Sequence, residues 1–172
     1  MIYTNIRLTT GEIMNDNSTA EAVLVVALCE NLDGTISIPF THSDRWRTIA
    51  WRLPGGGVEP YETPEEAATR ELLEETNLLA KKLYHSGVIH KPSRDTSHLT
   101  HRQHIFVCEI DSHNKMYTQV SDGKEILTNK LFDLQDVQEH LWKGFPFSTY
   151  PILPSHAKVL KDVLTKLFPI VS

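Results

Sequence analysis

The chain has 172 residues, of which 40% are hydrophobic and 23% are charged, and its formal net charge at pH 7 is −5. This composition is typical of a globular protein, and the length predicts a single domain over residues 1–172. The negative net charge argues against a protein that binds long nucleic acid through a broad basic surface. A small anionic ligand stays possible, because a divalent metal ion and a few arginines can neutralise it locally.

The cysteines, Cys29 and Cys108, lie in the apolar runs VLVVALCE and HIFVCEI. Such positions predict two buried thiols in a reducing compartment rather than a disulfide. The N-terminal residues show no basic start followed by an apolar stretch, and no apolar run reaches the ~20 residues that span a bilayer. We therefore expect a cytoplasmic protein with no membrane partner, either a monomer or a homodimer.

The first third of the chain predicts strands. Residues 21–30 are apolar and rich in valine, as in a buried strand, and residues 35–40 can pair with them across the turn residues 31–34. A further strand is predicted over residues 48–53, ending at Pro54.

A helix is predicted after the glycine run Gly55-Gly56-Gly57. Thr63 suits its N-cap, Pro64 suits the first helical position, and Glu66 completes a capping box. Asn77 marks its end, because asparagine tolerates the left-handed conformation of a C-cap.

The second half predicts strands over residues 101–110 and 124–132 and helices over residues 134–142 and 155–168. Strands that alternate with only a few helices predict a mixed sheet covered by helices on both sides, an α/β (α+β) fold.

The predicted central helix carries an unusual acidic face. Glu71, Glu74 and Glu75 fall within an arc of about 100° on a helical wheel. Three carboxylates at this spacing repel one another, and near the last turn they also oppose the helix dipole. Arg70 can pair with Glu74 at i,i+4 but offsets only part of this cost. The arrangement is explained either by a divalent cation such as magnesium or manganese, or by an ordinary solvated helix face.

The segment from Trp51 to Leu78, WRLPGGGVEPYETPEEAATRELLEETNL, resembles the signature of the Nudix (MutT-type) hydrolase family. The matched positions of this box (residues 56–78) are Gly56, Glu62, Arg70, Glu71, Leu72, Glu74, Glu75 and Leu78. One position departs from the pattern, because Asn77 stands where the family has glycine. The resemblance implies a Nudix-type αβα sandwich with a mixed β-sheet. Because asparagine tolerates positive φ better than most residues, we expect Asn77 to carry a small stability cost and to leave the chemistry intact.

The resemblance also implies the reaction and its cofactor. Nudix hydrolases cleave a nucleoside diphosphate linked to another group and release a nucleoside monophosphate, and they need Mg²⁺ or Mn²⁺. Arg70 is expected to hold the box carboxylates in place, and Glu62 to support the junction of loop and helix. The metal ligands implied are the carboxylates of Glu71, Glu74 and Glu75 and the backbone carbonyl of Gly55.

The stretch Gly123-Lys124-Glu125, followed by Leu131-Phe132, resembles the corresponding strand of mutator-type Nudix enzymes. It favours a (deoxy)nucleoside triphosphate as the small-molecule substrate over ADP-ribose or another nucleotide sugar. Glu125 is predicted to approach the metal site from outside the box, as a further metal ligand or as the base that acts on water. Asp122 is the alternative for this role. Pro92 is weak evidence for an ADP-ribose-cleaving relative.

Two other functions on the same fold stay open. A sensor that binds a nucleotide without cleaving it is expected to lose box carboxylates, and all are present here. An isomerase acting on an isoprenoid diphosphate is disfavoured, because neither cysteine lies in a polar setting.

Weaker candidates lie outside the box. Arg45 and Arg47 could contact phosphates, and Phe145 could stack on a nucleobase, although a solvated loop and core packing are the favoured explanations of these residues. Arg94 and Arg102 are similar candidates. The histidines at positions 85, 90, 98, 101 and 104 raise the question of zinc, but we expect polar surface side chains, since His101 and His104 point to opposite faces of a strand.

Overall fold

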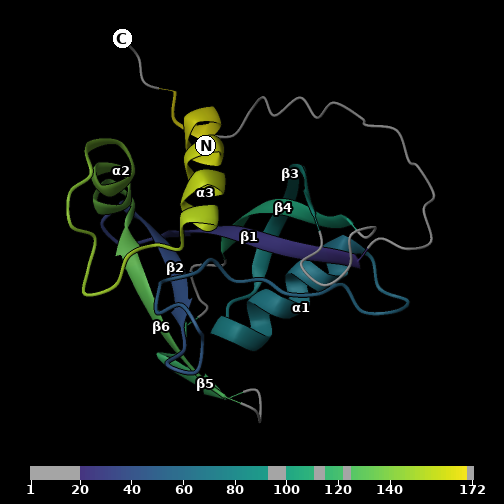
Figure 1. Cartoon of the computed structure of the whole chain (residues 1–172). Helices are drawn as coiled ribbons and strands as arrows, with labels where there is room; N and C mark the ends of the chain where they lie inside the picture. The colour runs from purple at the N-terminus through teal and green to yellow at the C-terminus, as the bar shows by residue number, and fades with distance from the viewer. Residues whose placement is uncertain (1–19, 93–99, 111–114, 122–124, 170–172) are drawn as a thin grey trace.

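The computed structural model describes residues 20–92, 100–110, 115–121 and 125–169 (Figure 1). The elements follow in the order β1 (Ala20–Glu30), β2 (Ile36–His42), α1 (Pro64–Thr76), β3 (Ala80–Pro92), β4 (Thr100–Ile110), β5 (Gln119–Ser121), β6 (Ile126–Asp133), α2 (Leu134–Lys143) and α3 (Pro154–Leu167). The strands form a six-stranded sheet in the order β3-β4-β1-β2-β6-β5. Strands β1 and β4 run parallel and the other neighbours antiparallel, so the sheet is mixed.

Strand β1 lies inside the sheet and is buried on both faces, which explains its continuous apolar sequence. Its even-numbered side chains, from Leu24 to Leu28, pack with α2 and α3, and the odd-numbered ones, from Val23 to Ala27, pack with α1. Helix α1 therefore covers one face of the sheet, and α2 and α3 cover the other (Figure 1). The predicted αβα sandwich with a mixed sheet is confirmed.

Most predicted elements lie within two residues of the observed ones, but the strand predicted over residues 48–53 is wrong. Within residues 48–53, only Trp51 and Arg52 pair with other segments, through isolated bridges to Ile152 and Thr41 respectively. The chain cannot continue this pairing, because Pro54 has no N–H to donate and the following residues turn along β1.

Strands β3 and β5 were not predicted. The sequence of β3, AKKLYHSGVIHKP, has no regular alternation, and register shifts interrupt its pairing with β4 near Ala80 and His85. It is an edge strand, so only one side of its backbone needs a partner strand. Strand β5 has only three residues, too few to produce a recognisable pattern.

Both cysteine thiols are free, as predicted. Cys108 is buried and Cys29 is partly buried. No helix in the described ranges is long and apolar enough to cross a membrane.

Helix α1 begins and ends as predicted. The Thr63 side chain accepts a hydrogen bond from the Glu66 N–H, and the Glu66 carboxylate accepts one from the Thr63 N–H, which completes the capping box. At the other end Asn77 has φ 63°, and its N–H donates to the Leu73 carbonyl at 2.8 Å. The Asn77 side chain also donates to the Lys115 carbonyl at 3.0 Å.

The helix end gives a test of this cap. Asn77→Gly should leave stability nearly unchanged, because relief of the positive φ offsets the lost bond to Lys115. Asn77→Val should cost about 1–3 kcal/mol, since a β-branched residue is strained at positive φ. The melting temperatures of the two variants test whether Asn77 acts as the C-cap residue. Equal melting temperatures for the valine and glycine variants would contradict this role.

Candidate active site

The loop after Pro54 is fixed against β1 by backbone hydrogen bonds. The N–H groups of Val25 and Val23 donate to the carbonyls of Pro54 and Gly56, at 2.9 and 2.8 Å. A side chain at Gly55 would overlap the Val23 carbonyl, and Gly55 has φ 152°. A side chain at Gly56 would overlap the Glu71 carboxylate. The two glycines therefore allow the loop to lie directly between β1 and α1.

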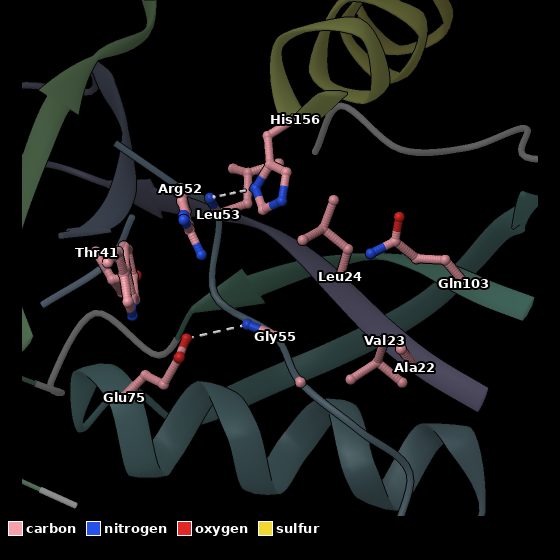
Figure 2. Close-up of a pocket in the computed structure, with 12 residues that line it drawn as sticks. Ala22, Val23, Leu24, Thr41, Arg52, Leu53, Gly55, Glu75, Gln103 and His156 are labelled. Atoms are coloured by element: carbon pink, nitrogen blue, oxygen red, sulfur yellow. Dashed lines mark hydrogen bonds between the residues drawn. The ribbon is translucent and has the colours of Figure 1, made fainter. Parts of the chain in front are cut away.

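Glu75 on α1 faces this loop. Its carboxylate accepts a hydrogen bond from the Gly55 N–H at 3.0 Å (Figure 2). Burial is the main reason that the pKa of Glu75 is raised to about 8, and the negative charges of Glu71 and Glu125 add to the rise. The Gly55 N–H and the positive charge of Arg52 oppose it.

Arg70 ties the acidic residues of the box together. Its guanidinium donates two hydrogen bonds to Glu62, at 3.1 and 2.6 Å, and one each to Glu71 and Glu74, at 2.9 and 3.1 Å. It also donates to the Gly57 carbonyl at 3.0 Å. These contacts raise the pKa of Arg70 and lower that of Glu62. Arg70 thus holds loop and helix in one arrangement.

The box carboxylates differ in their exposure. The Glu71 side chain is largely buried, at 14% exposure, and burial raises its pKa in spite of the Arg70 contact. The Glu74 side chain is 57% exposed, and its carboxylate contacts Arg70 at 3.1 Å. Glu71 and Glu75 therefore face the glycine loop, whereas the Glu74 side chain is mostly exposed to solvent.

Glu125 reaches the site from the beginning of β6. The indole N–H of Trp46 donates to its carboxylate at 3.2 Å. The Arg52 guanidinium lies over the Trp46 ring, with its central carbon 3.9 Å from the ring centroid. Glu125 is close enough to Glu75 and Arg52 to shift the pKa of both groups. Asp122, the alternative distal carboxylate, lies outside the described residues.

A cavity of about 160 Å³ opens beside Glu75 (Figure 2). One wall is β1, and the loop with Gly55 and Gly56 forms another. Polar side chains from distant parts of the chain complete it: Thr41, Trp46, Arg52, Gln103 and His156. The Nδ1 atom of His156 accepts a hydrogen bond from the Leu53 N–H at 3.0 Å, which places the ring proton of the neutral tautomer on Nε2.

The structure does not bring Arg45, Arg47 and Phe145 to this cavity. Arg45 and Arg47 are exposed, and neither lines it. Phe145 follows α2, is 51% exposed, and lies near Lys143. Arg102 pairs with Glu21 at 3.1 Å, whereas Arg94 lies outside the described residues.

The sequence analysis missed Trp46, Arg52, Gln103 and His156 as cavity residues. A signal existed for Arg52, which is a lone cation among the buried residues Ala50, Trp51 and Leu53. No local pattern marks Gln103 or His156, because they reach the cavity only through the packing of β4 and α3 on β1.

The expectation of surface histidines is wrong for His104, which is buried at 7% exposure. Its Nδ1 lies 3.3 Å from His85 Nε2, and its Nε2 lies 3.5 Å from the Glu21 carboxylate. Burial lowers the pKa of His104. His98 lies outside the described residues.

The residues around the glycine loop fit a divalent cation. Their carboxylates and backbone carbonyls are the oxygen donors that magnesium and manganese prefer. The space that Gly56 leaves for the Glu71 carboxylate, and the burial of Glu75 near Glu71 and Glu125, gather negative charge that a cation would stabilise. As they stand, no three His, Cys, Asp or Glu side chains of the described ranges are gathered closely enough to hold a metal ion.

Several curated proteins are similar to this chain. A Bacillus subtilis (strain 168) protein, provisionally named 8-oxo-dGTP diphosphatase, is 50% identical over 75 residues, 44% of either chain. The RNA pyrophosphohydrolase of Bartonella quintana (strain Toulouse) is 31% identical over 121 residues, 65% of either chain. The ADP-ribose pyrophosphatase of Methanocaldococcus jannaschii is 54% identical over 116 residues, 65% of this chain and 56% of the relative. The chain thus spans less than two thirds of each relative.

The solved structure of the Shewanella oneidensis NrtR NUDIX domain, complexed with ADP ribose, has a TM-score of 0.65 to this chain. The similarity covers 88% of this chain and 90% of the other at 17% sequence identity, so it shows the fold. The NUDIX domain profile matches residues 18–153, well over half of the sequence, and the chain therefore belongs to the NUDIX domain family.

Proposed function

We propose that the chain is a pyrophosphohydrolase that depends on Mg²⁺ or Mn²⁺ and cleaves a (deoxy)nucleoside triphosphate to a nucleoside monophosphate and pyrophosphate. The observation that carries this proposal is the packing of Glu71 and Glu75 against the Gly55-Gly56 loop, at the edge of a cavity with polar walls. The names of the Bacillus subtilis, Bartonella quintana and Methanocaldococcus jannaschii relatives all describe cleavage of a phosphoric anhydride bond.

The difficulty of the reaction lies in the charge of the substrate. A polyphosphate carries closely spaced negative charges that repel an incoming water oxygen. A bound divalent cation supplies neutralisation of this charge and activation of the attacking water. Glu71, Glu74, Glu75 and the Gly55 carbonyl would hold it, with Arg70 fixing the orientation of the carboxylates.

We assign the removal of the water proton to Glu125. Its carboxylate comes from the residue just before β6 rather than from α1, so it reaches the site from a different element than the box carboxylates. The Trp46 N–H contacts one of its oxygens at 3.2 Å and orients the carboxylate. A base in this position accepts the proton as the new oxygen–phosphorus bond forms and the anhydride bond breaks.

The substrate class gives the next prediction. We expect kcat/KM in Mg²⁺ to be higher for deoxynucleoside triphosphates than for ADP-ribose, following the resemblance of the stretch that contains Glu125 to mutator-type enzymes. The name of the Bacillus subtilis relative supports this order. Release of monophosphate from a panel of nucleotides measures both classes under one condition. A clear advantage for ADP-ribose would reverse the order.

ADP-ribose is the second candidate substrate, because the Methanocaldococcus jannaschii relative is named for it. A nucleotide sensor is disfavoured by the presence of Glu71, Glu74 and Glu75. An isomerase that uses a cysteine is also disfavoured. Burial raises the pKa of Cys29 to about 12 and that of Cys108 further, so neither thiol ionises near neutral pH.

A further inference from the structure

Arg52 is held rigidly at the wall of the cavity. Its backbone N–H donates to the Thr41 carbonyl at 2.9 Å, and its carbonyl accepts from the Thr41 N–H at 2.8 Å. This pair of bonds places the Arg52 side chain on the same wall as Thr41. The backbone position therefore depends on β2 and not on a mobile loop.

The side chain of Arg52 is also held in place. The Arg52 guanidinium lies over the Trp46 ring, 3.9 Å from its centroid, and the same indole donates its N–H to Glu125. A cation–π contact of this kind fixes the plane of the guanidinium while leaving its edge N–H groups to bind a ligand. Trp46 thus positions a cation and a carboxylate together.

Two carboxylates lie near the Arg52 guanidinium. Burial lowers the pKa of Arg52, and the negative charges of Glu125 and Glu75 partly oppose this lowering. Figure 2 shows Arg52 and Glu75 entering the cavity from opposite walls. The guanidinium therefore lies across the cavity from the Glu75 carboxylate, one of those proposed to hold the metal ion.

Two polar atoms in this wall lack a partner in the described part of the chain. They are Arg52 Nε, a donor, and Thr41 Oγ1, whose residue is 1% exposed. Buried polar groups are nearly always satisfied in folded proteins, so such a pair at a cavity points to a polar ligand. A ligand with oxygen acceptors would satisfy the donors of both side chains.

We propose that Arg52 binds a phosphoryl oxygen of the substrate diphosphate, with Trp46 as the residue that positions its guanidinium. This inference rests on the proposed function, because the diphosphate must lie beside Glu71 and Glu75. An anion between these carboxylates and Arg52 is stabilised by the arginine on the side away from the metal ion. Arginine suits this role, since its planar fork binds phosphate oxygens through two N–H groups.

A contact to the nucleobase is the competing role for Arg52. The direction toward Glu75 and Glu125 favours the phosphate, because a base is uncharged and gains nothing from lying near the metal carboxylates. The cavity is also smaller than the roughly 300–1,000 Å³ of sites that enclose a whole drug-sized ligand, so only part of a nucleotide fits beside Arg52.

The test uses the full chain and inorganic pyrophosphate, which has no base. Binding of pyrophosphate in Mg²⁺ is measured by calorimetry for wild type, Arg52→Gln and Arg52→Lys. We expect Kd to rise about tenfold for glutamine and less for lysine, which keeps the charge but not the fork. Lys166→Gln removes one exposed positive charge on α3 and should leave Kd unchanged.

Steady-state kinetics with dGTP and dTTP give the second readout. Arg52→Gln should raise KM for both nucleotides by a similar factor, with a smaller change in kcat, since Arg52 binds the diphosphate common to both. Wild-type pyrophosphate binding by Arg52→Gln, or a KM increase for one base alone, would overturn the assignment. Circular dichroism confirms that each variant is folded, and Arg52→Lys decides the matter if the glutamine variant is not.

The two assays also distinguish failure of the proposed pyrophosphohydrolase function from failure of the proposed role of Arg52. If the function fails, wild type releases no monophosphate from any nucleotide, whereas pyrophosphate calorimetry still reports on Arg52. If wild type cleaves nucleotides and Arg52→Gln behaves as wild type in both assays, only the role of Arg52 is wrong. Absence of pyrophosphate binding by wild type also contradicts that role.

Discussion

Glu75→Gln is expected to lower kcat by about 10²–10⁴-fold in Mg²⁺, the loss that follows removal of a key charged group from a catalytic site. Glutamine keeps the size of the side chain and one oxygen that can accept the Gly55 N–H. It removes the negative charge of the carboxylate that contacts the Gly55 N–H. Rates of monophosphate release measure the effect, and a rate within about twofold of wild type would show that Glu75 does not take part.

The same variant should be more stable than wild type in EDTA at pH 8.5. At that pH, above the raised pKa of about 8, the wild-type carboxylate is ionised in a largely buried position near Glu71 and Glu125. Removing the charge removes the free-energy cost of burying an ionised carboxylate and its repulsion from the two neighbouring carboxylates. Glu65→Gln is the matched control, because Glu65 is an exposed carboxylate on the same helix, and it should change neither kcat nor the melting temperature appreciably.

Local sequence patterns predicted the elements whose structure depends on local interactions. Helix α1 begins at Thr63 and ends at Asn77 because capping residues satisfy its terminal backbone groups, and those residues can be read directly. Strand β1 was equally clear, since burial on both faces requires an unbroken apolar run. Helices α2 and α3 followed from their apolar periodicity.

The elements that failed depend on partners far away in sequence. Residues 48–53 have the composition of a strand, yet only Trp51 and Arg52 find bridge partners before Pro54 ends the pairing. Strand β3 shows the reverse case. Its sequence is polar and irregular, and it forms a strand because β4 offers it a free edge.

The candidate site also combines residues placed by local interactions with residues placed by partners far away in the sequence. Glu71, Glu75 and Arg70 share one helix, so helical geometry alone places their side chains together. The cavity beside them is assembled from β1, β2, α1, β4, α3 and the connection between β2 and α1, and no short segment contains its pattern. Helical spacing therefore predicted the carboxylates on the α1 side of the cavity, whereas no local spacing predicted Arg52 and Trp46, the cation and the aromatic ring on another wall.

Glu125→Gln is the second variant with a large expected effect. If Glu125 removes the water proton, kcat should fall by about tenfold or more, with KM little changed, because the group acts mainly in the transition state. The amide keeps the oxygen that accepts the Trp46 N–H, so the melting temperature should stay close to that of wild type. Glu139→Gln, on an exposed pair with Lys143, is the matched control for loss of one carboxylate.

An unchanged kcat for Glu125→Gln would remove Glu125 from the mechanism and make Asp122→Asn the next variant to measure. A fall in kcat that Trp46→Phe reproduces in part would show that the orientation of the carboxylate matters, because phenylalanine keeps a ring beside Arg52 but cannot donate to Glu125.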